Sequence, residues 1–263
     1  MRGSKYVQSQ VGGVYKEIEG YLRAGRTVLF SGTPCQVAGL YSSLGDIDAA
    51  HLYTIDLVCH GVPSGPLFDR YLRGLQDRYG PFSPSAFRFR RMDRWNFQSQ
   101  IVREDARVTL PPRDSAFMEL YLSGALFRES CYHCPFARRE RIGDLTLGDF
   151  WGIGETEPFG EDPQRGCSLV LINSEKGYGL WDGVARDMFC SERSWDEAVR
   201  RNSALEVPSS RPRKRDGICQ RVIRHGFQPE LRRCLSEKFC RNLYARLHHQ
   251  FHLVKVKLCR KSA

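Results

Sequence analysis

Along the first eighty residues, stretches with apolar side chains at helical spacing alternate with short extended apolar runs. Each β-branched or apolar run is followed by a loop rich in small residues and then by a helical pattern. The predicted elements are a helix over 11–25, strands over 27–30 and 52–58, and helices over 36–43 and 66–79. Two strands joined by a crossover helix are expected to lie parallel in one sheet, so their following loops open at the same edge.

Beyond residue 80 the pattern predicts a mixture of strands and helices. Alternation of apolar and polar residues over 85–110 predicts two or three antiparallel strands. Further predicted elements are a helix over 114–124, a compact loop over 131–136, strands over 144–147 and 168–173, and a helix over 175–188. The fold class is therefore α/β, with a mixed, partly parallel sheet built from strand-loop-helix units.

A basic stretch with two prolines, residues 208–216, predicts a linker before Arg-rich helices. We therefore divide the chain into a domain over 1–207 and a basic helical C-terminal extension over 208–263.

The positive net charge of +10 arises in the C-terminal region, since residues 200–263 hold 17 Lys and Arg against 4 Asp and Glu. Such a surface could bind nucleic acid. Because the tail has no recognisable nucleic-acid motif, a solvated basic face or a dock for an acidic redox protein is favoured. Apolar residues at helical spacing over 239–258 make a membrane surface a further candidate partner.

The composition is that of a soluble globular chain, with 41% hydrophobic and 27% charged residues in 263. No stretch reaches the roughly 18 apolar residues of a membrane span, and the amino terminus lacks the apolar core of a signal peptide. A cytoplasmic location is therefore expected. The ten cysteines are then reduced thiols that pack, ligate metal or act as nucleophiles.

Four cysteines are candidate metal ligands. Cys35 and Cys59 follow consecutive predicted parallel strands, so their thiols are expected at one sheet edge. Cys131 and Cys134 form a CxxC loop that ends at Pro135. Four thiolates are the usual ligand set of a 4Fe-4S cluster, although four-cysteine zinc, a redox dithiol in the CxxC and simple packing fit the same residues. The remaining cysteines show no paired spacing and are interpreted as packing residues: Cys167, Cys190, Cys219, Cys234, Cys240 and Cys259.

Five motifs, in this order and spacing, resemble the beta-subunit family of coenzyme F420 hydrogenases and dehydrogenases. The motifs are KYVQS at 5–9, SGTPC at 31–35, CHGVPS at 59–64, CYHCPF at 131–136 and GDLTLGDFWG at 143–152. The resemblance covers roughly residues 4–230. It implies a flavin and iron-sulfur protein in which FAD passes electrons between a cluster and a diffusible two-electron carrier. The family's clustered cysteines fall on Cys35, Cys59, Cys131 and Cys134.

Two departures from the family pattern matter. Many members begin with a ferredoxin-like region that carries further CxxCxxC runs, and this sequence starts in the middle of the family pattern. We therefore expect a short form, a split-gene partner or a fragment, with a ferredoxin-like protein as its redox partner. Relatives also occur in bacteria without the deazaflavin coenzyme, so the resemblance leaves the carrier as coenzyme F420 or another two-electron carrier.

The flavin contacts are expected in three of these motifs. The loop from Ser31 to Cys35 joins a strand to a helix amino terminus, where backbone N–H groups and the helix dipole favour a phosphate or a thiolate. Lys5 can pair with a pyrophosphate and Tyr6 can stack on a ring, while Asp149 can accept from a ribose or a ring nitrogen. The predicted cofactor-binding set is Lys5, Tyr6, Ser9, Ser31, Gly32, Thr33, Gly148 and Asp149.

The leading hypothesis is an oxidoreductase module that relays electrons through FAD and one 4Fe-4S cluster. A zinc-stabilised binding module with a basic tail is the alternative from another class. An inactive truncated relative is a third. No catalytic residue is assigned.

Overall fold

The chain is described by a computed structural model that covers residues 4–91, 95–104, 106–163, 166–233 and 236. Its helices are α1 (Val14–Arg23), α2 (Pro34–Leu44), α3 (Gly65–Tyr79), α4 (Ala116–Leu122), α5 (Glu175–Ala185), α6 (Trp195–Arg200) and α7 (Arg215–His225). Its strands are β1 (Val28–Ser31), β2 (Leu52–Leu57), β3 (Phe87–Arg88), β4 (Gln100–Val102), β5 (Arg107–Thr109), β6 (Leu145–Asp149) and β7 (Ser168–Ile172). The mixed α/β fold predicted from the sequence is confirmed.

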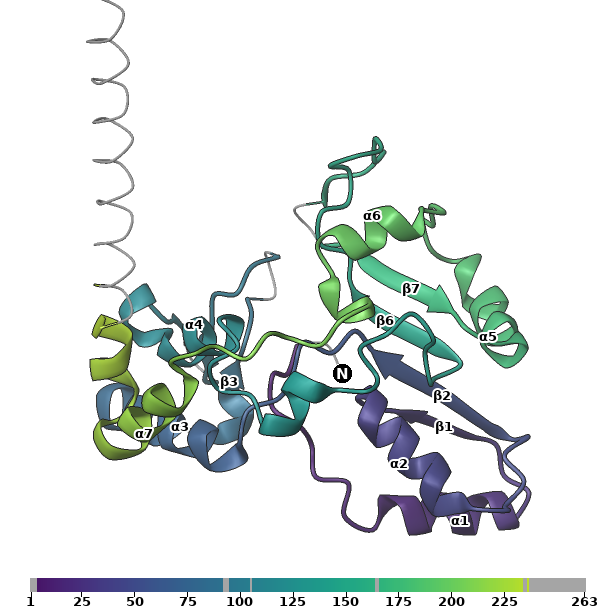
Figure 1. The fold of residues 1–263 in the computed structure, drawn as a ribbon, viewed down its shortest axis with the longest axis horizontal. Helices are drawn as coiled ribbons and strands as arrows, with labels where there is room; N and C mark the ends of the chain where they lie inside the picture. Colours follow the sequence, from purple (N-terminus) through teal and green to yellow (C-terminus); the bar gives the residue numbers. More distant parts are fainter. Residues whose placement is uncertain (1–3, 92–94, 105, 164–165, 234–235, 237–263) are drawn as a thin grey trace, which may run out of the picture.

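The larger sheet has the strand order β1-β2-β6-β7 (Figure 1). β1, β2 and β6 pair in parallel, and β7 is antiparallel to β6. The predicted parallel arrangement of the first two strands is therefore correct, and β6 joins them. All three parallel strands end at the same sheet edge, which places the loops after β1, β2 and β6 together.

Two hydrophobic clusters hold helices on this sheet. Residues of α1 and α2 pack with β1 and β2 around Leu40 and Leu52, both fully buried. A second cluster joins β7 and α6 through Leu169, Ala198 and Leu205. Apolar residues at helical spacing along α1 explain the first contact, because they place Ile18 and Leu22 on one face.

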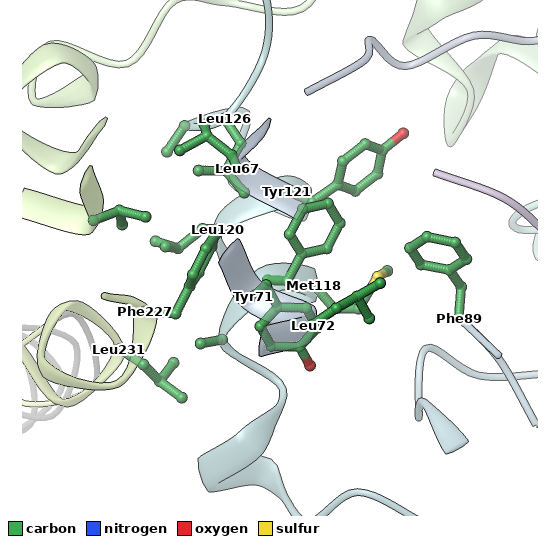
Figure 2. Close-up of a cluster of buried hydrophobic side chains, with 14 of the residues drawn as sticks. Leu67, Tyr71, Leu72, Phe89, Met118, Leu120, Tyr121, Leu126, Phe227 and Leu231 are labelled. Carbon is green, nitrogen blue, oxygen red and sulfur yellow. The ribbon is translucent and has the colours of Figure 1, made fainter. Parts of the chain in front are cut away.

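A separate core lies in the part of the chain drawn on the left of Figure 1. It surrounds α3 and α4, and Figure 2 shows Tyr71, Leu72, Phe89, Met118 and Tyr121 among the buried side chains of this core. The antiparallel sheet β3-β4-β5, predicted from the alternation over 85–110, contributes Phe87 and Ile101 to the same cluster.

The region after residue 207 begins as the sequence predicted, with an extended segment followed by helix α7. Ile218 and Val222 of α7 are buried in the core around α3 and α4. The division at residue 207 stays a prediction. The expectations for Cys234, Cys240, Cys259 and the apolar stripe over 239–258 fall outside the described residues. Within the described part, no helix has the length and apolar character needed to cross a membrane.

A buried ion pair ties β2 to the segment after the CxxC loop. Arg141 Nη2 lies 3.0 Å from Asp56 Oδ1, and both side chains are almost fully buried. The Asp56 carboxylate also accepts hydrogen bonds from the backbone N–H of Ile142 and Gly143, and Arg141 donates to the carbonyl of Phe136. Each charge is thus compensated inside the protein, as burial requires.

We expect Arg141→Met to lower the free energy of unfolding by about 3–5 kcal/mol, because it leaves the buried Asp56 carboxylate without its cation. Urea denaturation followed by circular dichroism measures the change. Arg138→Met removes a nearby but exposed arginine and is expected to have little effect. Equal destabilisation by the two substitutions would contradict this role for the ion pair.

Candidate functional site

A cavity of about 600 Å³ opens where the loops after β1, β2 and β6 meet the amino-terminal segment and the β3–β4 region. Seven of the eight residues predicted to bind a cofactor line it: Lys5, Tyr6, Ser9, Ser31, Gly32, Thr33 and Asp149. Gly148 does not line it. A Cβ at Gly148 would lie 2.7 Å from Val58 Cγ2, so this glycine allows the neighbouring loop to pack on β6. The volume is within the range of ligand-binding cavities, about 300–1,000 Å³.

Arg90 is the charged centre of the cavity wall. Its guanidinium lies among three aromatic rings, 4.6 Å from the Phe97 centroid, 5.3 Å from that of Trp151 and 5.4 Å from that of Tyr6. The Arg90 side chain is only 10% exposed. Trp151 also stacks on Trp95 at 4.3 Å between ring centroids, with 6° between the planes. The rings surround the cation, and the Tyr6 and Phe97 planes are tilted by 55° to each other.

Asp149 holds this surface in place. Its Oδ2 accepts a hydrogen bond from Arg90 Nη2 at 2.6 Å, and its Oδ1 accepts one from Trp95 Nε1 at 3.3 Å. The sequence analysis predicted Asp149 as an acceptor for a cofactor, and the structure gives it two protein partners. A carboxylate has about four acceptor sites, so both roles fit on one side chain.

One polar atom of this wall, Arg90 Nε, is buried and has no hydrogen-bond partner among the described residues. The Tyr6 hydroxyl is buried beside Ser4 and Arg90, with which it interacts. Burial raises the pKa of Tyr6 to about 12, so its hydroxyl keeps its proton at neutral pH and stays a donor.

The amino terminus of α2 has few backbone donors left for a phosphate. Gln36 Oε1 accepts from the backbone N–H of Thr33, the N-cap residue, and the N–H groups of Gln36 and Val37 donate to the Thr33 carbonyl. Pro34 has no N–H. A phosphate in the cavity would therefore depend mainly on side chains such as Lys5 rather than on the helix terminus alone, which differs from the sequence-based expectation.

The four candidate cysteine ligands come from three adjacent loops. Cys35 is in the first turn of α2, and Cys59 follows β2. Cys131 lies in the 3-10 helix η3 (Glu129–His133), and Cys134 directly follows it. Burial raises the pKa of Cys59 to about 12, and the charges of Cys131, Cys35 and Cys134 act in the same direction. Burial likewise raises the pKa of Cys131, with contributions from Cys134 and Cys35. The charges of the other three cysteines thus act on the Cys59 thiol, and a bound cation would offset them.

Among the described residues, no three His, Cys, Asp or Glu side chains form a group that could hold a single metal ion. All seven described cysteines are free thiols. Cys59 also lines the cavity, so the cysteine group and the cavity adjoin each other.

Gly61 allows two of the cysteine loops to meet. Its φ of +134° is outside the range that other residues readily adopt, and a Cβ there would lie 2.6 Å from the Phe127 ring. The loops are further joined by a bridge between Pro63 and Phe127 and by a hydrogen bond from the N–H of Arg128 to the carbonyl of Val62. This contact fixes Cys59 relative to Cys131.

Sequence reasoning missed Arg90, Trp95, Phe97 and Trp151 as parts of the site. The signal was present in the run Phe-Arg-Phe-Arg at 87–90, where arginines alternate with buried aromatic residues in β3 and the two residues after it. Only the approach of the segment after β3 to the end of β6 brings these side chains to the cavity.

The cavity and the candidate thiols thus lie near the carboxyl edge of a parallel sheet, where α/β folds commonly bind ligands. Residues 25–197 match the family described as the C-terminal part of the coenzyme F420 hydrogenase/dehydrogenase beta subunit, and the chain belongs to this family. Hydrogenases and dehydrogenases are oxidoreductases, so the family supports an oxidoreductase-type role. The family identified from the sequence motifs is confirmed.

Among solved structures, one similar chain comes from the xenon-derivatized F420-reducing [NiFe] hydrogenase complex of Methanosarcina barkeri. The two share 18% sequence identity with a TM-score of 0.42, over 71% of this chain and 57% of that one. The match thus spans little more than half the length of that hydrogenase chain. A search of curated proteins found no match.

We expect Gly61→Ala to destabilise the protein by about 1–3 kcal/mol, because the new methyl group meets Phe127 and the backbone is strained. Gly65→Ala is the matched control, since a Cβ at Gly65 meets no atom within 4 Å. Urea denaturation measures both variants. If they unfold at the same denaturant concentration, the close contact at Gly61 is not required.

Proposed function

We propose that the chain is an electron-transfer module that binds FAD in the cavity and one 4Fe-4S cluster at Cys35, Cys59, Cys131 and Cys134. The observation that carries the proposal is the position of Cys59, which belongs to the thiol group and also lines the cavity. Two cofactors bound at these sites would be neighbours. When bound, the flavin would supply exchange between two-electron and one-electron transfer, and the cluster would accept or donate single electrons.

The residues of the cavity fit a flavin. The rings of Tyr6, Phe97 and Trp151 offer apolar surface for a planar ring system, and Arg90 supplies a positive charge that is already oriented by Asp149. A positive charge beside a flavin favours the anionic reduced form. Lys5 is exposed at the wall of the same cavity, where it would pair with the phosphates.

The thiol group fits a cluster for two reasons. Four cysteines are the usual ligand set, and buried thiols with raised pKa values are disfavoured as free thiolates but stable as ligands of a cationic metal centre.

The electron carriers on either side belong to the proposal as well. A diffusible two-electron carrier, coenzyme F420 or another, would exchange with the flavin. A ferredoxin-like protein would exchange single electrons with the cluster, and the basic character of the C-terminal region supports an acidic partner.

Anaerobic purification followed by analysis of iron, sulfide, zinc and flavin tests the proposal. We expect about four iron and four sulfide per chain together with flavin. Zinc without iron would support the four-cysteine zinc module. A chain without metal or flavin would support the inactive relative.

We expect replacement of Cys35, Cys59, Cys131 or Cys134 by Ala to abolish or greatly reduce bound iron, because each removes one of four cluster ligands. Cys190→Ala and Cys219→Ala are the controls, since neither residue belongs to the thiol group, and both are expected to keep wild-type iron. Equal iron loss in all six variants would indicate general instability instead of ligation.

We expect Arg90→Met to weaken flavin binding about 10- to 100-fold, corresponding to the loss of one hydrogen bond to a charged group. Quenching of flavin fluorescence on titration measures the affinity. Arg88→Met is the control, because Arg88 lies two residues before Arg90 but donates to the backbone carbonyl of Ser85. The interpretation of the cavity fails if both variants bind flavin as the wild type does.

A further inference from the structure

Gln8 bridges the loops that carry the candidate cluster ligands. Its Nε2 lies 3.6 Å from Cys35 Sγ and 3.4 Å from Thr33 Oγ1, so the amide donates toward the first turn of α2. Its Oε1 accepts a hydrogen bond of 2.7 Å from Arg128 Nη1. Arg128 is the N-cap residue of η3, which contains Cys131.

The contact with Arg128 fixes which end of the amide faces the sulfur. A guanidinium only donates hydrogen bonds, so it must face the amide oxygen. The NH₂ group of Gln8 is therefore directed at Cys35 Sγ, and the alternative with the oxygen at the sulfur would place two donors against each other. The neighbouring residue is anchored as well, because Gln36 Nε2 donates to the carbonyl of Ser9 at 3.0 Å.

We propose that Gln8 is a positioning residue that raises the reduction potential of the cluster by donating an N–H group to the sulfur of Cys35. This inference rests on the proposed function, because it needs a cluster at the four cysteines. Hydrogen bonds to ligand sulfurs stabilise the reduced cluster, which carries one more negative charge, and so raise its potential. Arg128 acts through Gln8 by holding the amide in the donating orientation.

The same residue connects the cluster side of the site with the cavity. Gln8 lines the cavity between Tyr6 and Ser9, while its side chain reaches Cys35 and Arg128. The potential of the cluster is therefore set by the segment that also forms part of the proposed flavin site. Electron transfer between the two cofactors depends on the difference of their potentials, so Gln8 would set its driving force.

Gln8→Met tests the proposal, because methionine is close to glutamine in length but has no N–H to donate. Gln8→Glu is the second variant. It keeps an acceptor for Arg128 and replaces the donor by a negative charge. Gln10→Met is the matched control, since Gln10 is exposed and lies in the same segment. Each full-length chain is prepared anaerobically, its iron and sulfide are measured, and its cluster is titrated with dithionite while the EPR signal of the reduced cluster is recorded.

We expect the midpoint potential to shift to more negative values in Gln8→Met and further in Gln8→Glu, with iron and sulfide contents equal to those of the wild type. Gln10→Met is expected to match the wild type. An unchanged potential in Gln8→Met at full iron content overturns the inference. Loss of iron in both Gln8 variants also overturns it, because Gln8 would then be needed for assembly instead of for the potential. A wild-type chain that binds no cluster would instead refute the proposed function, and the inference with it.

Discussion

Parallel pairing of β1, β2 and β6 is the constraint on which the rest of the structure depends. Parallel strands end at one edge, so the loops after the three strands must share a small volume. Cys35 and Cys59 follow β1 and β2 at this edge, and Asp149 is the last residue of β6. The CxxC loop reaches the same place because Arg141, a few residues beyond it, is buried against Asp56 of β2. The cavity and the thiol group are consequences of this shared edge.

The protein buries positive charge by two different means. Arg141 is compensated by a fully buried carboxylate and by backbone groups, which is a structural use of an ion pair. Arg90 is surrounded by aromatic rings, and its carboxylate partner Asp149 is one-third exposed. Aromatic rings stabilise a cation without satisfying its hydrogen-bond donors. That difference leaves Arg90 Nε without a hydrogen-bond partner among the described residues, whereas the Arg141 guanidinium has several.

Glycine makes the close packing of the site possible. Gly61 lies against the Phe127 ring and Gly148 against Val58, and a Cβ at either position would come within 2.7 Å of a neighbouring side chain. Both contacts bring a loop that follows β2 onto another element. The sequence analysis interpreted Gly148 as a cofactor contact, whereas its position in the structure indicates a packing role. The two functions look alike in a sequence because both require the absence of a side chain.

The order of strands and helices, the parallel relation of the first two strands and the family could all be predicted from the sequence. Periodicity reports which face of an element is apolar, and a crossover helix fixes the relative direction of the strands that it joins. The sequence also indicated the four cysteines, because equivalent loops and a CxxC are local patterns. The contacts among Arg90, Trp95 and Trp151, and the position of Gln8 between Cys35 and Arg128, arise only when the chain folds. These contacts join residues as many as 120 positions apart in the chain, and no local pattern encodes which distant side chains will meet.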